Sequence, residues 1–319
     1  MRNKTAIILF LALSIFSLTS LGQSSFKNEF GFKSDNDAYL FYGQDRYYTN
    51  GLMLYFRQAT DQNKLGERLE KFIYEISAGQ KMFNPKGGNV GKEEDQDRPF
   101  AGYLYAGASA NFFYKTESIL KTSLELGTVG PHSLGEDAQK LLHETVGFYP
   151  INGWQYQIKN ELTANLSIQY TRLLHRSKQD RIDFSFEGYA NLGTTFNGAG
   201  AGILMRTGNI NQLFQTAYTN STVGTRLKSA KLVIAETFFY AKPQLNYVAY
   251  DATIQGSLFN DDSPVIFKTE PFVFAQQLGF NYSSQRFTFD FGLLFKTKEV
   301  KSTAKAHQYG TISMFYRFN

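Results

Sequence analysis

Polar side chains suited to cation binding gather in one segment between two predicted strands. The segment from Asn36 to Gly51 is rich in tyrosine, and it also holds two aspartates, two asparagines, an arginine and a threonine. Carboxylate and amide oxygens at short spacing suit a hard cation such as Ca²⁺, although the spacing is not that of an EF-hand. A solvated loop is the alternative that composition alone favours. The polar members are Asn36, Asp37, Asp45, Arg46, Thr49 and Asn50.

A second polar segment precedes another predicted strand. An acidic run from Glu93 to Asp97 is followed directly by Arg98. Most charge runs are solvated faces, so the acidic run by itself indicates little. An arginine beside the start of a strand is more informative, because a guanidinium can bind a phosphate or fix a neighbouring carboxylate such as Asp97.

A third segment predicts a short helix in a long connection. Ser133 and Glu136 have the spacing of a capping box, with serine at the N-cap and glutamate three residues later. Gly147 would end the helix. The sequence therefore predicts a helix from about residue 134 to residue 145.

His143 on this helix is the best candidate for a general base. Gln139 lies four residues earlier and hence on the same face, whereas Leu141 and Leu142 are expected to pack toward the rest of the molecule. A lone histidine on a helix is more often structural than catalytic. A histidine that activates water, beside a cation that polarises an ester carbonyl, would nevertheless make a hydrolytic site. No Gly-x-Ser-x-Gly motif supports a serine nucleophile.

The rest of the chain predicts an all-β fold. In the segment 287–296, for example, aromatic and leucine side chains alternate with more polar ones, which is the pattern of an amphipathic strand. Aromatic residues make up 16% of the chain, yet its mean hydropathy is −0.33. This combination favours an outer-membrane barrel over a secreted soluble β protein. We expect twelve strands near 26–34, 51–59, 72–83, 102–115, 118–128, 160–173, 181–193, 198–207, 231–249, 271–283, 286–298 and 307–318.

Residues 1–22 have the pattern of a signal peptide, with Arg2 and Lys4 before an apolar run and small residues before Gln23. We expect one domain over 23–319, placed in the outer membrane. The chain has no cysteine, which excludes disulfides. Its net charge of +5 is compatible with an anionic lipid surface. No nucleic-acid partner and no oligomer are indicated.

Strand order predicts where the polar segments lie. In an up-and-down barrel, the connections after odd-numbered strands all emerge at one end. The three polar segments, at 35–50, 84–101 and 129–159, follow the first, third and fifth predicted strands. We therefore expect them to converge at the outer rim of the barrel.

Taken in order, the motifs of these segments resemble the lipid A deacylase LpxR family of outer-membrane enzymes. The resemblance implies a twelve-stranded barrel that hydrolyses an acyl ester of lipid A, the 3′-acyloxyacyl group, with Ca²⁺ as cofactor. The motifs are Asn36-Asp37, the run from Asp45 to Gly51, the run from Asp97 to Gly102, the run from Gly127 to Pro131, Gln139 to His143, Gly153-Trp154-Gln155, Gln157 and Glu161.

The resemblance also implies roles for single residues. The family's catalytic histidine falls on His143, and its glutamine partner falls on Gln139. The Asn-Asp pair of the family falls on Asn36 and Asp37, which would bind Ca²⁺ and take part in catalysis, and its threonine falls on Thr49. In this interpretation lipid A, or lipopolysaccharide, is the partner in the membrane.

One position departs from the family pattern. A family lysine shortly before the Asp-Arg of the second segment is replaced here by Asp95 and Gln96. The nearest basic residues are Lys92 and Arg98, which become the candidates for substrate binding.

Two alternatives stay open at this stage. The chain could be a non-catalytic outer-membrane barrel that binds or supports a partner, or a small porin, for which about twelve strands is marginal. Within the first segment, we expect Asp45, Arg46 and the tyrosines to shape the loop rather than to take part in the chemistry.

Overall fold

Twelve antiparallel strands close into one barrel in the computed structural model, which describes residues 25–40, 45–225, 233 and 235–319. Each strand pairs with its neighbours in sequence, and β1 closes the barrel against β12. The strands are β1 Asn28–Asn36, β2 Tyr47–Ala59, β3 Leu69–Asn84, β4 Ala101–Tyr114, β5 Ser118–Val129, β6 Glu161–Arg176, β7 Ile182–Gly193, β8 Phe196–Asn209, β9 Glu236–Asp251, β10 Phe272–Ser283, β11 Phe287–Lys296 and β12 His307–Phe318.

The twelve-strand all-β prediction is confirmed, and each observed strand overlaps its predicted segment. The predicted signal peptide at 1–22 lies outside the described residues, as do residues 231, 232 and 234 of the predicted ninth strand.

Alternation along each strand gives the barrel an apolar outside and a polar inside. On β11, Phe287 and Phe289 are 39% and 40% exposed, whereas Thr288 between them is buried. The inside holds ion pairs, such as the Arg57 guanidinium between the carboxylates of Glu29 at 2.9 Å and Glu75 at 2.5 Å. An outward apolar band and an inward polar face are what a barrel in a lipid bilayer requires.

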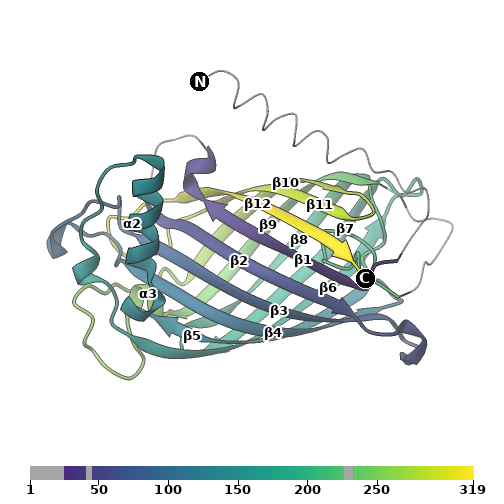
Figure 1. The fold of residues 1–319 in the computed structure, drawn as a ribbon, viewed down its shortest axis with the longest axis horizontal. Helices are drawn as coiled ribbons and strands as arrows, with labels where there is room; N and C mark the ends of the chain where they lie inside the picture. The colour runs from purple at the N-terminus through teal and green to yellow at the C-terminus, as the bar shows by residue number, and fades with distance from the viewer. Residues whose placement is uncertain (1–24, 41–44, 226–232, 234) are drawn as a thin grey trace, which may run out of the picture.

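The helices lie at the end of the barrel opposite the C-terminus (Figure 1). They are α2, Gly135–Val146, in the β5–β6 connection, and α3, Ala252–Gln255, after β9. Short 3₁₀ turns are Asp37–Leu40, Gln62–Lys64, Glu93–Asp95, Pro131–Ser133 and Trp154–Tyr156. Within the described part of the chain, no helix has the length and apolar character needed to cross a membrane.

The three polar segments meet at the helical end, as predicted. The backbone amide of Val90 donates to the carbonyl of Asn152 at 2.9 Å, and the amide of Asn152 donates to Gly88 at 2.9 Å. These bonds join the β3–β4 connection to the β5–β6 connection. The β1–β2 connection reaches the same place through Asp45, which bonds to Gln139 of α2.

A segment at the other end folds back into the barrel. Residues 210–225, which follow β8 and are called the plug segment here, place Leu213, Phe214 and Val223 in an apolar cluster with the inner wall. The Lys71 amine of β3 donates to the Ser221 carbonyl at 2.6 Å, and the Thr222 hydroxyl of the plug donates to Glu29 of β1 at 3.0 Å. The plug segment is therefore tied to several strands across this end of the lumen.

Two expectations about α2 are wrong. Leu134 rather than Ser133 is the N-cap residue, and its φ of 57° places it in the left-handed region. Ser133 belongs to the preceding 3₁₀ turn, where its hydroxyl donates to the Gly130 carbonyl at 2.6 Å, and the helix has no side-chain capping bond at its N-terminus. Leu141 does not pack toward the barrel, because it is 67% exposed. Gly147 does end the helix, in the left-handed conformation that favours glycine.

Candidate active site

A small cavity at the rim brings together the residues that the sequence proposed for chemistry. Its volume of about 30 Å³ has room for a water molecule or a single cation. The cavity lies between α2 and the ends of β1, β2 and β3. Its lining residues are Asn36, Asp37, Ala38, Asp45, Thr49, Asn50, Met82, Gln139, Leu142, His143 and Phe148.

The carboxylate of Asp45 is the centre of the hydrogen bonds around this cavity. It accepts from the Asn84 amide at 3.0 Å, from the Gln139 amide at 3.1 Å and from the Tyr149 hydroxyl at 2.6 Å. It also accepts a short bond from the Thr49 hydroxyl. Four donors from β2, the end of β3, α2 and the connection after α2 therefore hold one carboxylate in place.

His143 is buried at the cavity wall, and its two ring nitrogens have different surroundings. Its Nδ1 lies 2.8 Å from the backbone carbonyl of Tyr149, and its Nε2 lies 3.3 Å from an Asp45 oxygen. A carbonyl can only accept, so Nδ1 carries the hydrogen in the neutral imidazole. This tautomer leaves a lone pair on Nε2, the nitrogen on the side of Asp45, where it could accept a proton.

Gln139 is oriented by the only tryptophan of the chain. The Trp154 indole donates to the Gln139 side-chain oxygen at 2.7 Å, so the amide NH₂ of Gln139 must face Asp45. Trp154 is itself buried and packs against Phe100. A side chain at Gly135 would approach the Trp154 ring to 2.9 Å, so glycine there lets α2 lie close to this aromatic support.

Asp37 is a buried carboxyl group near a second carboxylate. Burial raises the pKa of its carboxyl to about 8, and the nearby Asp45 charge adds to the rise. A hydrogen bond from the Arg46 amide at 2.9 Å opposes this rise only in part. A bound cation would lower the pKa of Asp37 again, because positive charge favours the ionised carboxylate. Asn36 is next to it, although its side-chain oxygen already accepts from the Ala38 amide at 2.7 Å.

The donor chemistry suits Ca²⁺, which takes carboxylate, amide, backbone and water oxygens. Among the described residues, no group of three His, Cys, Asp or Glu side chains is placed to hold a metal. A cation here would therefore combine the carboxylates of Asp37 and Asp45 with neutral oxygens, which Ca²⁺ accepts readily and Zn²⁺ does not.

The two basic candidates for substrate binding are not brought to this cavity. Arg98 is buried, and its guanidinium stacks on Phe83 at 4.4 Å and donates to the Thr253 hydroxyl at 2.8 Å. Lys92 is exposed and lies 4.0 Å from Glu94. Neither side chain lines the cavity. Arg98 instead connects the β3–β4 connection to α3.

Arg98 gives a prediction about stability. Replacing it with methionine should lower the stability of the barrel by about 2 kcal/mol, because the bonds of a charged donor to Thr253 are lost. Thermal unfolding followed by the gel mobility of unheated and heated samples measures the effect. Lys92→Met is the control and should unfold as the wild type does. An unchanged unfolding temperature in Arg98→Met, together with lost activity, would assign Arg98 to the substrate instead.

Sequence reasoning did not assign Asp45 a place beside the base. It was expected to shape the loop, and it does bond within that loop, but its carboxylate also faces His143 and Gln139. No local spacing relates residue 45 to residue 143. The available signal was its position in the same polar motif as Thr49.

The comparison with protein families decides what kind of molecule carries this site. The family described as Outer membrane protein LpxR matches residues 7–318. The chain belongs to the LpxR family. It is therefore an outer-membrane protein, and the match extends over the whole barrel and all three polar segments.

A solved structure from the LpxR family has the same fold. LpxR from Salmonella typhimurium is 21% identical, has a TM-score of 0.72, and the match covers 91% of this chain and 100% of that one. The β domain of the Bordetella autotransporter BrkA is 10% identical with a TM-score of 0.45, covering 92% of this chain and 99% of that one. No curated protein sequence matches the chain.

Proposed function

We propose that this LpxR-family protein is a hydrolase that removes the 3′-acyloxyacyl chain from lipid A. The observation that carries the proposal is the rim cavity, where Nε2 of a buried histidine lies 3.3 Å from the Asp45 carboxylate and Asp37 lines the same cavity. Membership of the LpxR family supports the substrate class. A base with a fixed tautomer beside a cation site is the minimum set for ester hydrolysis by water.

The proposed reaction uses His143 first as a base and then as an acid. Nε2 takes a proton from water while the water oxygen attacks the ester carbonyl carbon, giving a tetrahedral oxyanion and an imidazolium. The oxyanion then collapses and the bond from the carbonyl carbon to the sugar oxygen breaks. The imidazolium returns its proton to that oxygen, so the products are a carboxylic acid and a free 3′-hydroxyl.

The neighbours of His143 serve this cycle by position. The Tyr149 carbonyl keeps the Nδ1 hydrogen in place throughout. The Asp45 carboxylate, at 3.3 Å, stabilises the imidazolium that forms when the proton is taken. Gln139 and Thr49 hold Asp45, so their proposed contribution acts through that carboxylate. Asp37, with Asn36 and Asp45, would hold Ca²⁺, which when bound supplies positive charge for the ester carbonyl oxygen.

The surroundings of the cavity fit an amphiphilic substrate. Phe148 lines the cavity and is 54% exposed, and Leu141 and Val146 on α2 are 67% and 50% exposed. Exposed apolar side chains next to a polar site mark a surface for a lipid or another apolar partner. An acyl ester of a membrane lipid presents polar and apolar parts at this same boundary.

The porin alternative is disfavoured by the plug segment, which is bonded to strands across one end of the lumen. The proposal is tested by mass spectrometry of lipid A from cells that express the chain in Ca²⁺-containing medium. The expected result is loss of the mass of one acyloxyacyl group. Unchanged lipid A, with the folded barrel present in the outer membrane, would contradict the proposal.

Asp45 gives a prediction that separates catalysis from binding. Asp45→Asn keeps the size of the side chain but removes the charge beside the imidazolium. We expect kcat to fall about tenfold to a hundredfold, equal to about 1.4 to 2.7 kcal/mol of barrier, with little change in KM. Steady-state assays on purified lipid A measure both constants. A rise in KM at unchanged kcat would mean that Asp45 contacts the substrate instead.

A further inference from the structure

The barrel encloses a second cavity that the proposed reaction does not use. It has a volume of about 450 Å³, lies in the half of the lumen toward the helical end, and is called the upper lumen cavity here. It shares no lining residue with the cavity at His143. Its size is that of an ordinary small-molecule site, which spans about 300 to 1,000 Å³.

Positive charge exceeds negative charge on its wall. Five basic side chains line it, from Lys33, Lys81, Arg98, Lys242 and Lys296, against three acidic ones, from Asp35, Asp251 and Glu299. Three of the basic groups have a carboxylate partner, at 3.5 Å for Lys33, 3.0 Å for Lys242 and 2.9 Å for Lys296. Within the described ranges, Lys81 and Arg98 have no ion pair within 4.0 Å.

Lys81 is the basic group best placed to meet a ligand. Its amine lies 5.5 Å from the ring centre of Tyr105 and 5.9 Å from those of Tyr103 and Phe196. The nearby carboxylates of Glu125 and Asp35 favour its charge, whereas the charges of Lys33 and Lys296 oppose it. Aromatic faces offset part of the cost of holding an ammonium away from bulk water. An anion beside Lys81 would offset the remaining cost of holding its ammonium away from bulk water.

The neutral lining indicates what else the ligand carries. Aromatic rings suit the C–H faces of a sugar, and side-chain amides offer both donors and acceptors to hydroxyl groups. The upper lumen cavity has both kinds of group around its cationic wall. The aromatic ones are Tyr48, Tyr55, Phe83, Tyr105, Tyr189, Phe196, Tyr247, Tyr250 and Tyr309, and the amides are Asn191, Asn197, Gln244, Asn246 and Gln277.

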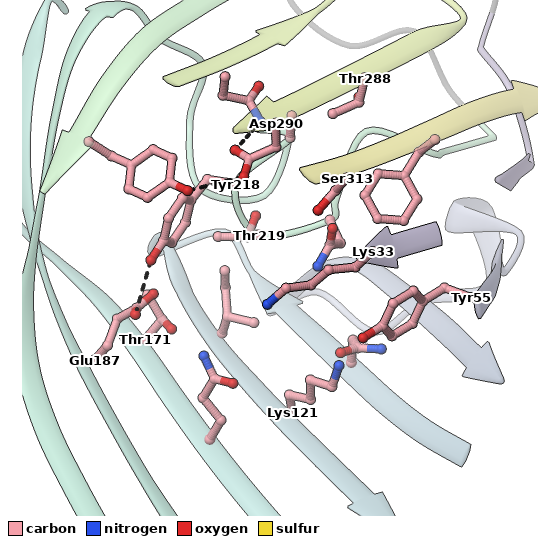
Figure 2. Close-up of a pocket in the computed structure, with 18 of the residues that line it drawn as sticks. Lys33, Tyr55, Lys121, Thr171, Glu187, Tyr218, Thr219, Thr288, Asp290 and Ser313 are labelled. Carbon is pink, nitrogen blue, oxygen red and sulfur yellow. Dashed lines mark hydrogen bonds between the residues drawn. The ribbon is translucent and has the colours of Figure 1, made fainter. Parts of the chain in front are cut away.

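The adjoining cavity toward the plug segment has a different balance of positive and negative charge. It has a volume of about 350 Å³, and Lys33 extends into it from β1 (Figure 2). There Lys121 pairs with Glu75 at 2.6 Å, and Arg57 lies between two carboxylates. Tyr218 of the plug donates to Glu187 at 3.3 Å, which is drawn as a dashed line in Figure 2. Its basic groups are therefore compensated within the protein.

We propose that the upper lumen cavity is a binding site for a small phosphorylated sugar, with the phosphate beside Lys81 and the ring against the aromatic wall. This inference is independent of the deacylase proposal, because it concerns a separate cavity and needs no lipid. The closed plug end makes the site a blind pocket rather than part of a channel.

The test is calorimetric titration of the purified barrel in detergent with glucose 1-phosphate, and with glucose and inorganic phosphate as separate probes. We expect saturable binding of glucose 1-phosphate and weaker binding of the other two. Lys81→Met should weaken it at least about tenfold, the value of one charge-assisted contact. Lys81→Arg should retain most of it. Lys178→Met, an exposed position in the β6–β7 turn, is the matched control and should bind as the wild type does.

Several outcomes would overturn the proposal. They are no saturable binding to the wild type, equal binding by Lys81→Met, or inorganic phosphate binding as tightly as the sugar phosphate. Heat-modifiable gel mobility checks that each variant is folded. If Lys81→Met does not fold, Lys81→Gln takes its place, because it keeps a polar head without the charge. Lipid A deacylation by these variants tests the other proposal separately.

Discussion

Replacing His143 with alanine is expected to lower the rate of lipid A deacylation by about 10² to 10⁴-fold, the range for loss of a general base. No other imidazole lines the cavity, and the remaining polar groups there are carboxylates, amides and a hydroxyl. Mass spectrometry of lipid A from expressing cells and initial rates with purified barrel both report the change. The barrel should fold normally, because the strands do not depend on this side chain.

Two further variants make the interpretation specific. Lys140→Ala lies on the same helix but its amine pairs with Glu136 on an exposed face, so its activity should match that of the wild type. In His143→Gly, added imidazole should restore part of the rate if the lost group acts as a base. Wild-type turnover in His143→Ala would remove this residue from the reaction. A loss that imidazole leaves unchanged would indicate a structural role for the ring.

Most of the barrel could be predicted because the alternation of apolar and polar residues along a strand shows which side chains face the membrane and which face the lumen. Phe287, Thr288 and Phe289 alternate in sequence and in exposure, so the pattern alone gives strand, length and inward face. Convergence of the three polar segments also followed, because it needs only the order of the strands. The plug segment was not predicted, since Leu213 and Phe214 have no periodicity and contact an inner wall built from distant strands.

Contacts within the candidate site could be predicted only where both residues belong to the same sequence motif. His143 and Gln139 share a helix face, and that relation is visible from their spacing. The contact between Asp45 and His143 spans two connections and depends on how their loops fold. For Arg98, the sequence motif suggested phosphate binding. In the structure its guanidinium instead donates to Thr253, which lies far along the sequence.

Asp37→Asn is expected to abolish Ca²⁺ binding and to lower deacylation by about 10²-fold or more, because a buried carboxylate is the main anionic donor of the proposed site. The direct measurement is the rise in unfolding temperature that Ca²⁺ produces in chelator-treated protein, which does not depend on turnover. The wild type should be stabilised and Asp37→Asn should not. Asp180→Asn, at an exposed turn whose φ of 55° asparagine tolerates well, should respond as the wild type does.

The same carboxylate sets the pH dependence. Its pKa is raised from 3.8 to about 8 in the folded chain. Without cation, and at pH values between 3.8 and about 8, Asp37 therefore holds a proton in the folded state that it has lost in the unfolded state. The contribution of this proton to folding stability is greatest at low pH and is lost as the pH rises toward 8. Ca²⁺ requires the ionised carboxylate, so its affinity should fall about tenfold for each pH unit below about 8. Titrations at about pH 6 and about pH 9 measure this competition. Asp37→Asn should lose both the proton-linked slope and the Ca²⁺ response, and a Ca²⁺ affinity independent of pH would place the cation elsewhere.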